Sequence, residues 1–103
     1  MQFLLIAYDG KDDKALERRM AVREAHMALA DINKATGHAL YGGAILDDNG
    51  KMIGSMMVVD YPDQAAVDAW LKEEPYVTGK VWTHIEVKPF RLGPTFCAAK
   101  SAA

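Results

Sequence analysis

The sequence predicts an α+β domain in which two helices pack on one four-stranded antiparallel sheet. Strand-like and amphipathic segments follow one another in the order β-α-β-β-α-β. The two middle strands are joined by Asp47–Gly50 (DDNG), whose composition is typical of a hairpin turn. Two β-α-β halves in this order form the ferredoxin-like arrangement.

The composition suits a single globular domain. The chain has 103 residues, and half of them are hydrophobic, which excludes a disordered protein. We expect the domain to occupy residues 1–92, and the small residues at 93–103 to form a fraying tail. The net charge is −2, and acidic and basic residues are interspersed. This distribution lacks the basic patch with which proteins bind nucleic acid or an anionic membrane.

The single cysteine and the N-terminal run favour a cytoplasmic protein. Cys97 has no second cysteine with which to form an internal disulfide, and six methionines accompany it. The apolar run Gln2–Tyr8 has no basic leader, and Asp9 interrupts it well short of a membrane-spanning length. We therefore predict a strand. Because both of its faces are apolar, it should lie inside the sheet.

A long helix is predicted from Lys14 to Thr36. Asp12 or Asp13 can cap its N-terminus, and Gly37 can adopt the left-handed conformation that follows a helix. The apolar face expected to meet the sheet consists of Leu16, Met20 and Met27, widened by Val22, Leu29 and Ile32.

The hairpin extends from His38 to Asp60, and we place it at the centre of the sheet because both faces of its strands are apolar. Glycines interrupt both strands: Gly42 and Gly43 in the first, and Gly54, followed by Ser55, in the second. Glycine weakens a strand unless a bulge, a ligand or a neighbouring backbone uses the space. Two explanations stay open, a shallow pocket or close packing against a helix.

A second helix and a last strand complete the order. Pro62 or Asp63 begins the helix, about Asp63–Lys72, and Pro75 stops it because a residue before proline disfavours helical backbone. The strand Val81–Phe90 alternates apolar and polar residues, and Pro89 suggests that its end lies at a sheet edge. The buried face of the helix should comprise Ala66, Val67, Trp70 and Leu71.

This topology places both helices on one face of the sheet. The other face would be a bare apolar patch of a size that monomeric proteins avoid. A second copy of the chain, packed face to face, would cover it. The two-sided apolar pattern of the strands therefore predicts a homodimer.

His26 is the strongest candidate for chemistry, because histidine can exchange a proton near neutral pH. It shares a face of the long helix with Arg19 and Arg23, beside the apolar stripe. The alternative is a helix histidine that bonds a neighbouring loop or faces water. Glu73 and Glu74, at the end of the second helix, either orient His26 or remain solvated charges on a turn.

No pattern in the sequence indicates a metal or a cofactor, and we predict neither. His38 and His84 complete the histidines, and no pair has the spacing of a helical metal motif. The glycines match neither a phosphate-binding loop nor a dinucleotide fingerprint, and no serine lies in a nucleophile elbow. Trp70, Trp82 and Tyr76 are expected in the core or at an interface.

Four motifs in order resemble the YciI-like, or YCII-related, family. The segment Arg18–His26 (RRMAVREAH) is similar to the signature helix of that family, and Gly42 with Gly54-Ser55 is similar to its hairpin. Glu74–Val77 (EPYV) resembles its Asp-Pro-Tyr turn, and Val87–Phe90 (VKPF) resembles the end of its last strand. The resemblance covers nearly the whole predicted domain.

The resemblance implies a ferredoxin-like dimer of the dimeric α/β-barrel type, with a small pocket and a histidine–aspartate pair as the proposed active site. The histidine carries over to His26. The acid carries over to Glu74, where glutamate replaces the aspartate of the family and reaches one methylene group further. The wider superfamily includes muconolactone isomerases and cofactor-free monooxygenases, and some YciI-like proteins are linked to dehalogenation of aromatic breakdown products.

We therefore expect an acid–base enzyme of the isomerase, lyase or dehalogenase type, acting without a cofactor on a small cyclic or aromatic-derived molecule. His26 would exchange the proton and Glu74 would orient it. The alternative is a non-enzymatic dimer that binds a small ligand, or a stress-related accessory module with a vestigial pocket. The residues expected to contact the small molecule are Arg23, for an anionic group, Ser55 and Tyr76, as hydrogen-bond donors, and Gly42.

Overall fold

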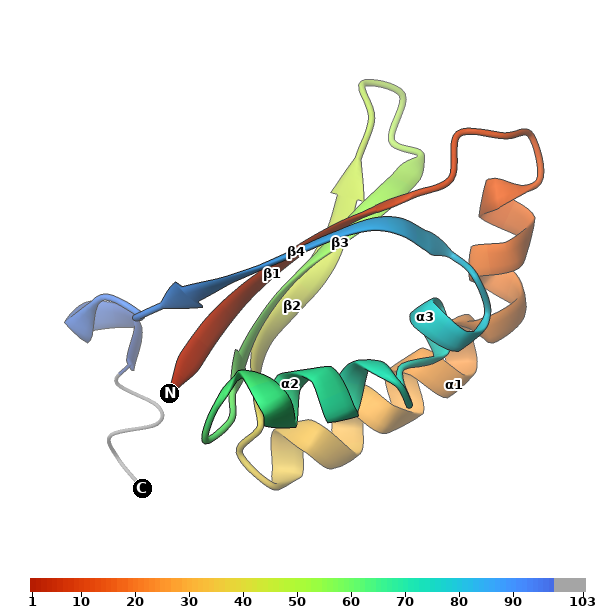
Figure 1. Ribbon diagram of the computed structural model, residues 1–103. Helices are drawn as coiled ribbons and strands as arrows, with labels where there is room; N and C mark the ends of the chain where they lie inside the picture. The colour runs from red at the N-terminus through yellow and green to blue at the C-terminus, as the bar shows by residue number, and fades with distance from the viewer. Residues whose placement is uncertain (98–103) are drawn as a thin grey trace.

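A computed structural model describes residues 1–97, whose four strands form one antiparallel sheet in the order β2-β3-β1-β4. Helices α1, α2 and α3 all lie on the same face of this sheet (Figure 1). The predicted α+β class and the four-stranded antiparallel sheet are thus confirmed. The elements are β1 (Gln2–Asp9), α1 (Ala15–Ala35), β2 (Ala39–Leu46), β3 (Met52–Asp60), α2 (Gln64–Leu71), α3 (Pro75–Thr78), β4 (Trp82–Phe90) and the 3-10 turn η1 (Pro94–Cys97).

The hairpin β2–β3 is displaced from the centre of the sheet where we expected it. Strand β3 is central, but β2 lies at the edge, because β1 pairs with β3 on one side and β4 on the other. Strand β4 takes the opposite edge, which suits Pro89, a residue without a backbone N–H to donate. The turn itself is as predicted, with Gly50 at φ +83°.

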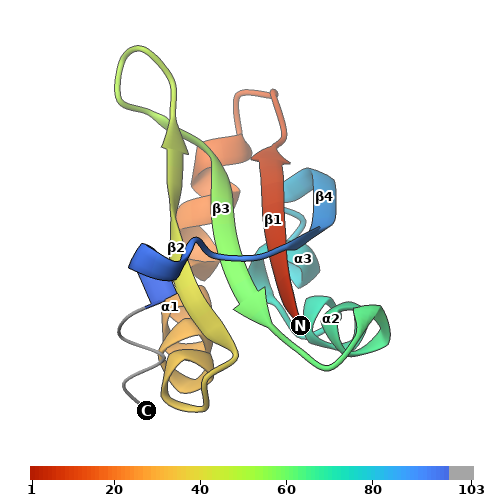
Figure 2. The same ribbon diagram turned by 90° about the vertical axis from the view of Figure 1, so that its left-hand side faces the viewer.

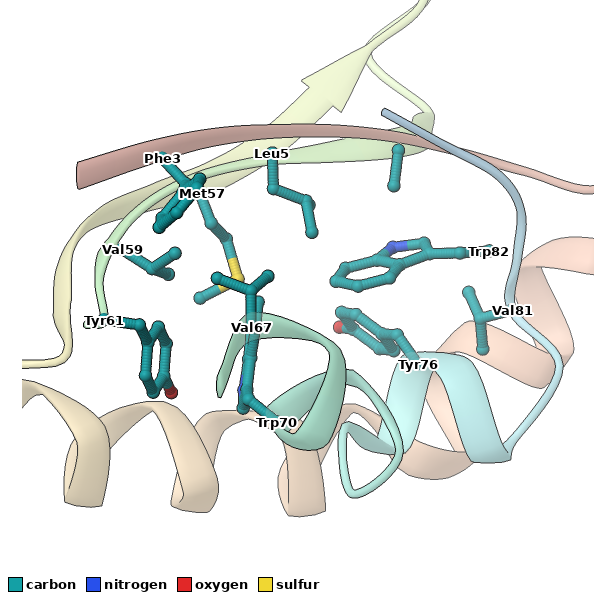
Figure 3. Packing of buried hydrophobic residues seen from close by; sticks show 11 residues of the cluster. Phe3, Leu5, Met57, Val59, Tyr61, Val67, Trp70, Tyr76, Val81 and Trp82 are labelled. Atoms are coloured by element: carbon teal, nitrogen blue, oxygen red, sulfur yellow. The ribbon is translucent and has the colours of Figure 1, made fainter. Parts of the chain in front are cut away.

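The core lies between the sheet and the helices (Figure 3). Alternate residues of β1 point into it, so Phe3, Leu5 and Ala7 are at most 2% exposed. Val67 and Trp70 of α2 pack against them, as the predicted helix face requires. Trp82 also joins this core, as expected, next to a register shift between Tyr8 and Asp9 that pairs Asp9 with Trp82.

Helix α1 buries only part of the predicted face: Val22 and Leu29 are partly buried and pack against the core, but Ile32 is exposed. Its two buried residues are Ala15 and Arg19, while Met20 and Met27 are 51% and 46% exposed. Residues three and four positions apart recur on more than one face of this helix, so spacing alone does not decide which face is buried. The buried face is the one whose polar groups have partners in the interior. Of the three polar residues expected beside the apolar stripe, Arg19 and His26 face inward and Arg23 is exposed.

The helix termini show which capping predictions hold. Gly37 follows α1 at φ +84°, as predicted, and the Asp63 carboxylate accepts the Ala66 N–H at 2.9 Å at the start of α2. The N-cap residue of α1 is Lys14, not Asp12 or Asp13. The Asp12 carboxylate instead binds the Arg18 guanidinium at 2.7 and 2.8 Å.

Helix α3 was not predicted. Pro75 does follow the end of α2, but it also begins a new helical turn, a position in which its missing N–H costs nothing. Glu74 caps this turn, since its side chain accepts the Tyr76 N–H at 3.2 Å. As a result Glu74 is only 1% exposed, and is not a solvated charge on a turn.

The chain after β4 crosses the face of the sheet opposite the helices and reaches β2 (Figure 2). The Leu92 N–H donates to Gln2 Oε1 at 2.7 Å, and the Tyr41 hydroxyl donates to the Phe96 carbonyl at 3.0 Å. Residues 93–97 of the predicted tail therefore have a defined place, and residues 98–103 lie outside the described part. In residues 1–97, no helix combines the length and apolar content needed to cross a membrane.

Candidate functional site

A cavity of about 530 Å³ lies between helix α1 and strands β2 and β3. Several of the strand residues that line it are small, among them Gly42, Ala44 and Ser55. At Gly42, for example, an added Cβ would have no neighbour closer than 3.5 Å. The residues of its wall that bear on function are Arg19, Arg23, His26, Gly42, Ser55 and Tyr76.

His26 lines this cavity, and the structure places the buried Glu74 in contact with it. Nδ1 of His26 lies 2.5 Å from Oε1 of Glu74, and the two side chains are 12% and 2% exposed. An ionised carboxylate can only accept hydrogen bonds, so Glu74 favours the imidazole tautomer that carries its hydrogen on Nδ1. Nε2 then keeps its lone pair, and within residues 1–97 no side chain forms a hydrogen bond with this nitrogen.

Aromatic rings hold the histidine in place. The His26 ring stacks on Tyr76 with centroids 3.9 Å apart, and the edge of Trp82 approaches at 6.3 Å. Arg19 also packs over the Tyr76 ring, with Cζ 4.6 Å from its centre. Burial raises the pKa of the Tyr76 hydroxyl, so this group stays protonated and can donate.

Behind the cavity runs a chain of buried polar groups from four elements. Nη1 of Arg19 donates to both carboxylate oxygens of Asp9 at 3.1 Å, and Nη2 donates to Ser55 Oγ at 3.0 Å. Nε1 of Trp82 also donates to Ser55 Oγ, at 3.2 Å. Burial raises the pKa of the Asp9 carboxyl, and the Arg19 guanidinium opposes this shift.

The two explanations for the glycines both apply, at different positions. Gly42 lines the cavity, together with Ser55. Gly54 does not, because it lies on the opposite face of the sheet, where an added Cβ would be 2.5 Å from the Ala7 carbonyl oxygen. Close packing of the strands therefore accounts for Gly54.

Sequence reasoning missed the importance of Asp9, Arg19 and Trp82. Two signals point to the first two. Asp9 continues the buried side of β1, and Arg19 precedes His26 by seven residues, which places both on one helix face. Charged groups that are buried need partners, so the sequence could have been used to predict that Asp9 and Arg19 form a pair. Trp82 carries no such signal, because a strand irregularity determines its side.

A second hollow, of about 700 Å³, lies near the β2–β3 turn and is bordered by Tyr8, Asp12 and His84. His84 is exposed there and bonds the exposed Glu86 at 3.2 Å. Asp9 also borders this hollow, but the histidine there, His84, has no contact with a buried carboxylate among the described residues. In residues 1–97, no three His, Cys, Asp or Glu side chains gather closely enough to hold a metal ion.

Known structures share this fold. The 5-chloro-2-hydroxyhydroquinone dehydrochlorinase of Burkholderia phenoliruptrix, solved with 2,5-dihydroxybenzoquinone, superposes with a TM-score of 0.78 at 22% identity, covering 92% of this chain and 98% of that one. A dimeric ferredoxin-like protein of unknown function from a Jannaschia species superposes with a TM-score of 0.55 at 14% identity, covering 88% and 98%. At these identities the similarity shows the ferredoxin-like fold alone.

Sequence comparison is more specific. Residues 1–91 match the YCII-related domain. Protein YciI of Escherichia coli O6:H1 is 32% identical over 97 residues, which cover 88% of this chain and 97% of that protein, and protein YciI of Shigella flexneri matches equally. The chain therefore belongs to the YCII-related family.

Proposed function

We propose that this protein is an acid–base enzyme that moves a proton on a small cyclic, aromatic-derived molecule held in the cavity beside α1. The observation that carries the proposal is the contact between His26 and a carboxylate that is 1% exposed. A buried acid bonded to a cavity histidine is the arrangement that orients a general base. The dehydrochlorinase of similar fold supports this class of substrate.

The proposed step needs only the residues at the wall. Nε2 of His26 takes a proton from the substrate, and Glu74 stabilises the imidazolium that forms. In an isomerisation the same nitrogen returns the proton at another atom. In a dehydrochlorination the proton stays on His26 and chloride leaves with the electrons of its bond to carbon. The exposed Arg23 can hold an anionic group of the substrate at the mouth.

Turnover of chlorinated and unchlorinated hydroquinones, beginning with 5-chloro-2-hydroxyhydroquinone, tests the proposal. We expect His26→Asn to lower the rate by about a hundredfold or more, the usual scale of general acid–base catalysis. The matched control is His84→Asn, which removes an exposed histidine remote from the cavity and should leave the rate unchanged. Equal rates for His26→Asn and wild type would refute the acid–base role. Binding without turnover would instead indicate a small-molecule-binding dimer.

We also propose that two copies pack through the face of the sheet opposite the helices, to form a dimeric α/β barrel. Along β1 and β3 this face carries Leu4, Ile6, Tyr8 and Met56. Tyr8 is 40% exposed and Met56 is 36% exposed in the single chain, although both lie on central strands. Central strands that expose large apolar side chains indicate a missing layer.

Light scattering tests this packing. Wild type should have about twice the chain mass of 11.3 kDa, and Met56→Asp should have the mass of one chain, because a charge would be buried without a partner. Met20→Asp, the same change at an exposed methionine on α1, should leave the dimer intact. A wild-type monomer at micromolar concentration would disprove the packing.

A further inference from the structure

Ser55 lies where its hydroxyl can meet a molecule in the cavity. It is 3% exposed, belongs to the central strand β3, and faces α1 at the wall of the cavity. Its oxygen accepts two hydrogen bonds, from Arg19 Nη2 at 3.0 Å and from Trp82 Nε1 at 3.2 Å. Both donors are themselves buried, so these bonds are shielded from water.

Because of these two bonds, the Ser55 hydroxyl can act toward a bound molecule only as a hydrogen-bond donor. A serine oxygen has two lone pairs and one hydrogen, whereas a guanidinium and an indole N–H can only donate. Arg19 and Trp82 therefore occupy both lone pairs, and only the hydrogen of Ser55 remains. Among residues 1–97, the Ser55 hydroxyl forms no hydrogen bond in which it is the donor. A buried donor without an acceptor is costly, so a bound molecule should supply one.

The charges around the cavity favour a negative acceptor. Arg19 places a guanidinium directly against the serine oxygen, and Arg23 and Lys34 contribute two more cations to the wall. Asp31 is the one carboxylate among its described lining residues, and the buried Asp9 and Glu74 are bonded to Arg19 and His26. A hydrogen bond to an ionised oxygen is about twice as strong as one to a neutral oxygen.

We infer that Ser55 donates its hydrogen to an ionised oxygen of the substrate, and that Arg19 and Trp82 are positioning residues that prevent the hydroxyl from acting as an acceptor. The substrate is thus a phenol or enol of a small ring, bound as its phenolate or enolate. This inference rests on the proposed function of the same cavity and adds the chemical form of the molecule and the group that selects it.

The probe for this inference is 4-nitrophenol, which ionises near neutral pH and absorbs at a different wavelength as its anion. Titrated in the presence of excess wild-type protein, its apparent pKa should fall by about one unit, which corresponds to a tenfold preference for the phenolate. Ser55→Ala should abolish this shift, because the variant lacks the hydroxyl that selects the phenolate.

Two positioning variants make the test specific. Trp82→Phe frees one lone pair, so the hydroxyl can turn away, and the shift of the probe should shrink. Arg19→Met should abolish it, and Arg19→Lys should restore part of it, since an ammonium can still donate to Ser55 Oγ. Circular dichroism should confirm that each variant is folded.

The outcomes separate this inference from the proposed function. His26→Asn should keep the full shift of the probe, even though it loses turnover. If the pKa of 4-nitrophenol shifted but no hydroquinone were turned over, the phenolate-binding site would be supported and the proposed enzymatic activity would be rejected. If wild type failed to bind the phenolate, bound 4-nitrophenol as the neutral phenol, or shifted its pKa no more than Ser55→Ala, the inference would be overturned.

Discussion

Glu74→Gln should slow turnover by about a thousandfold. Glutamine keeps the shape of the side chain, and its oxygen can still accept the hydrogens of His26 Nδ1 and the Tyr76 backbone. What it loses is the negative charge that stabilises the imidazolium. Opposite charges about 4 Å apart attract by about 4 kcal/mol at an effective dielectric of about 20, close to three powers of ten in rate.

The neighbouring residue supplies the control. Glu73→Gln makes the same chemical change one position earlier, at an exposed side chain, and should leave kcat unchanged. The double variant of Glu74→Gln and His26→Asn should be no slower than the slower of the two single variants, because residues that act as one unit are not additive. If both glutamine variants had wild-type kcat values, Glu74 would have no role in catalysis.

Asp9→Asn should lower the free energy of unfolding by about 3–5 kcal/mol, the usual cost of breaking a buried ion pair by removing one partner. The side chains of Arg19 and Asp9 are 4% and 3% exposed, so the guanidinium would keep its charge with no carboxylate to balance it. Urea unfolding followed by circular dichroism measures the loss. Asp12→Asn, which opens the partly exposed pair with Arg18, should change stability far less.

A double replacement separates the effect of the two charges from the effect of side-chain packing. Changing Asp9 to Leu and Arg19 to Met removes both charges at similar volume, and such changes are often neutral or stabilising. If the double variant lost as much unfolding free energy as Asp9→Asn, the unbalanced charge would not be the cause of the destabilisation.

The fold was largely predictable because its signals are local. The turn at Asp47–Gly50, the cap at Asp63 and the left-handed Gly37 all depend on a few adjacent residues. The misplaced features depend on partners distant in sequence. Strand β2 lies at an edge because β1 pairs with both β3 and β4. Arg19 of α1 points inward because its guanidinium forms hydrogen bonds with Asp9 and Ser55.

The site divides in the same way. The motifs around His26 and Glu74 are short stretches of sequence, so the two residues could be proposed together from a family resemblance, and the structure places them in contact. The chain through Asp9, Arg19, Ser55 and Trp82 joins residues of two strands, a helix and the irregular start of β4. No local pattern reveals such a chain. Only the register shift beside Asp9 brings Trp82 within reach of Ser55.

The position of Trp82 gives the protein an internal optical reporter. Its indole N–H is bonded to Ser55, and its ring lies 6.3 Å from His26. Indole emission shifts with local polarity and is quenched by a nearby protonated imidazole. Trp70 lies in another part of the core, with its ring 6.0 Å from Tyr61, and Trp70→Phe would leave Trp82 as the single tryptophan. Its fluorescence would then follow both the filling of the cavity and the proton on His26, without an added dye.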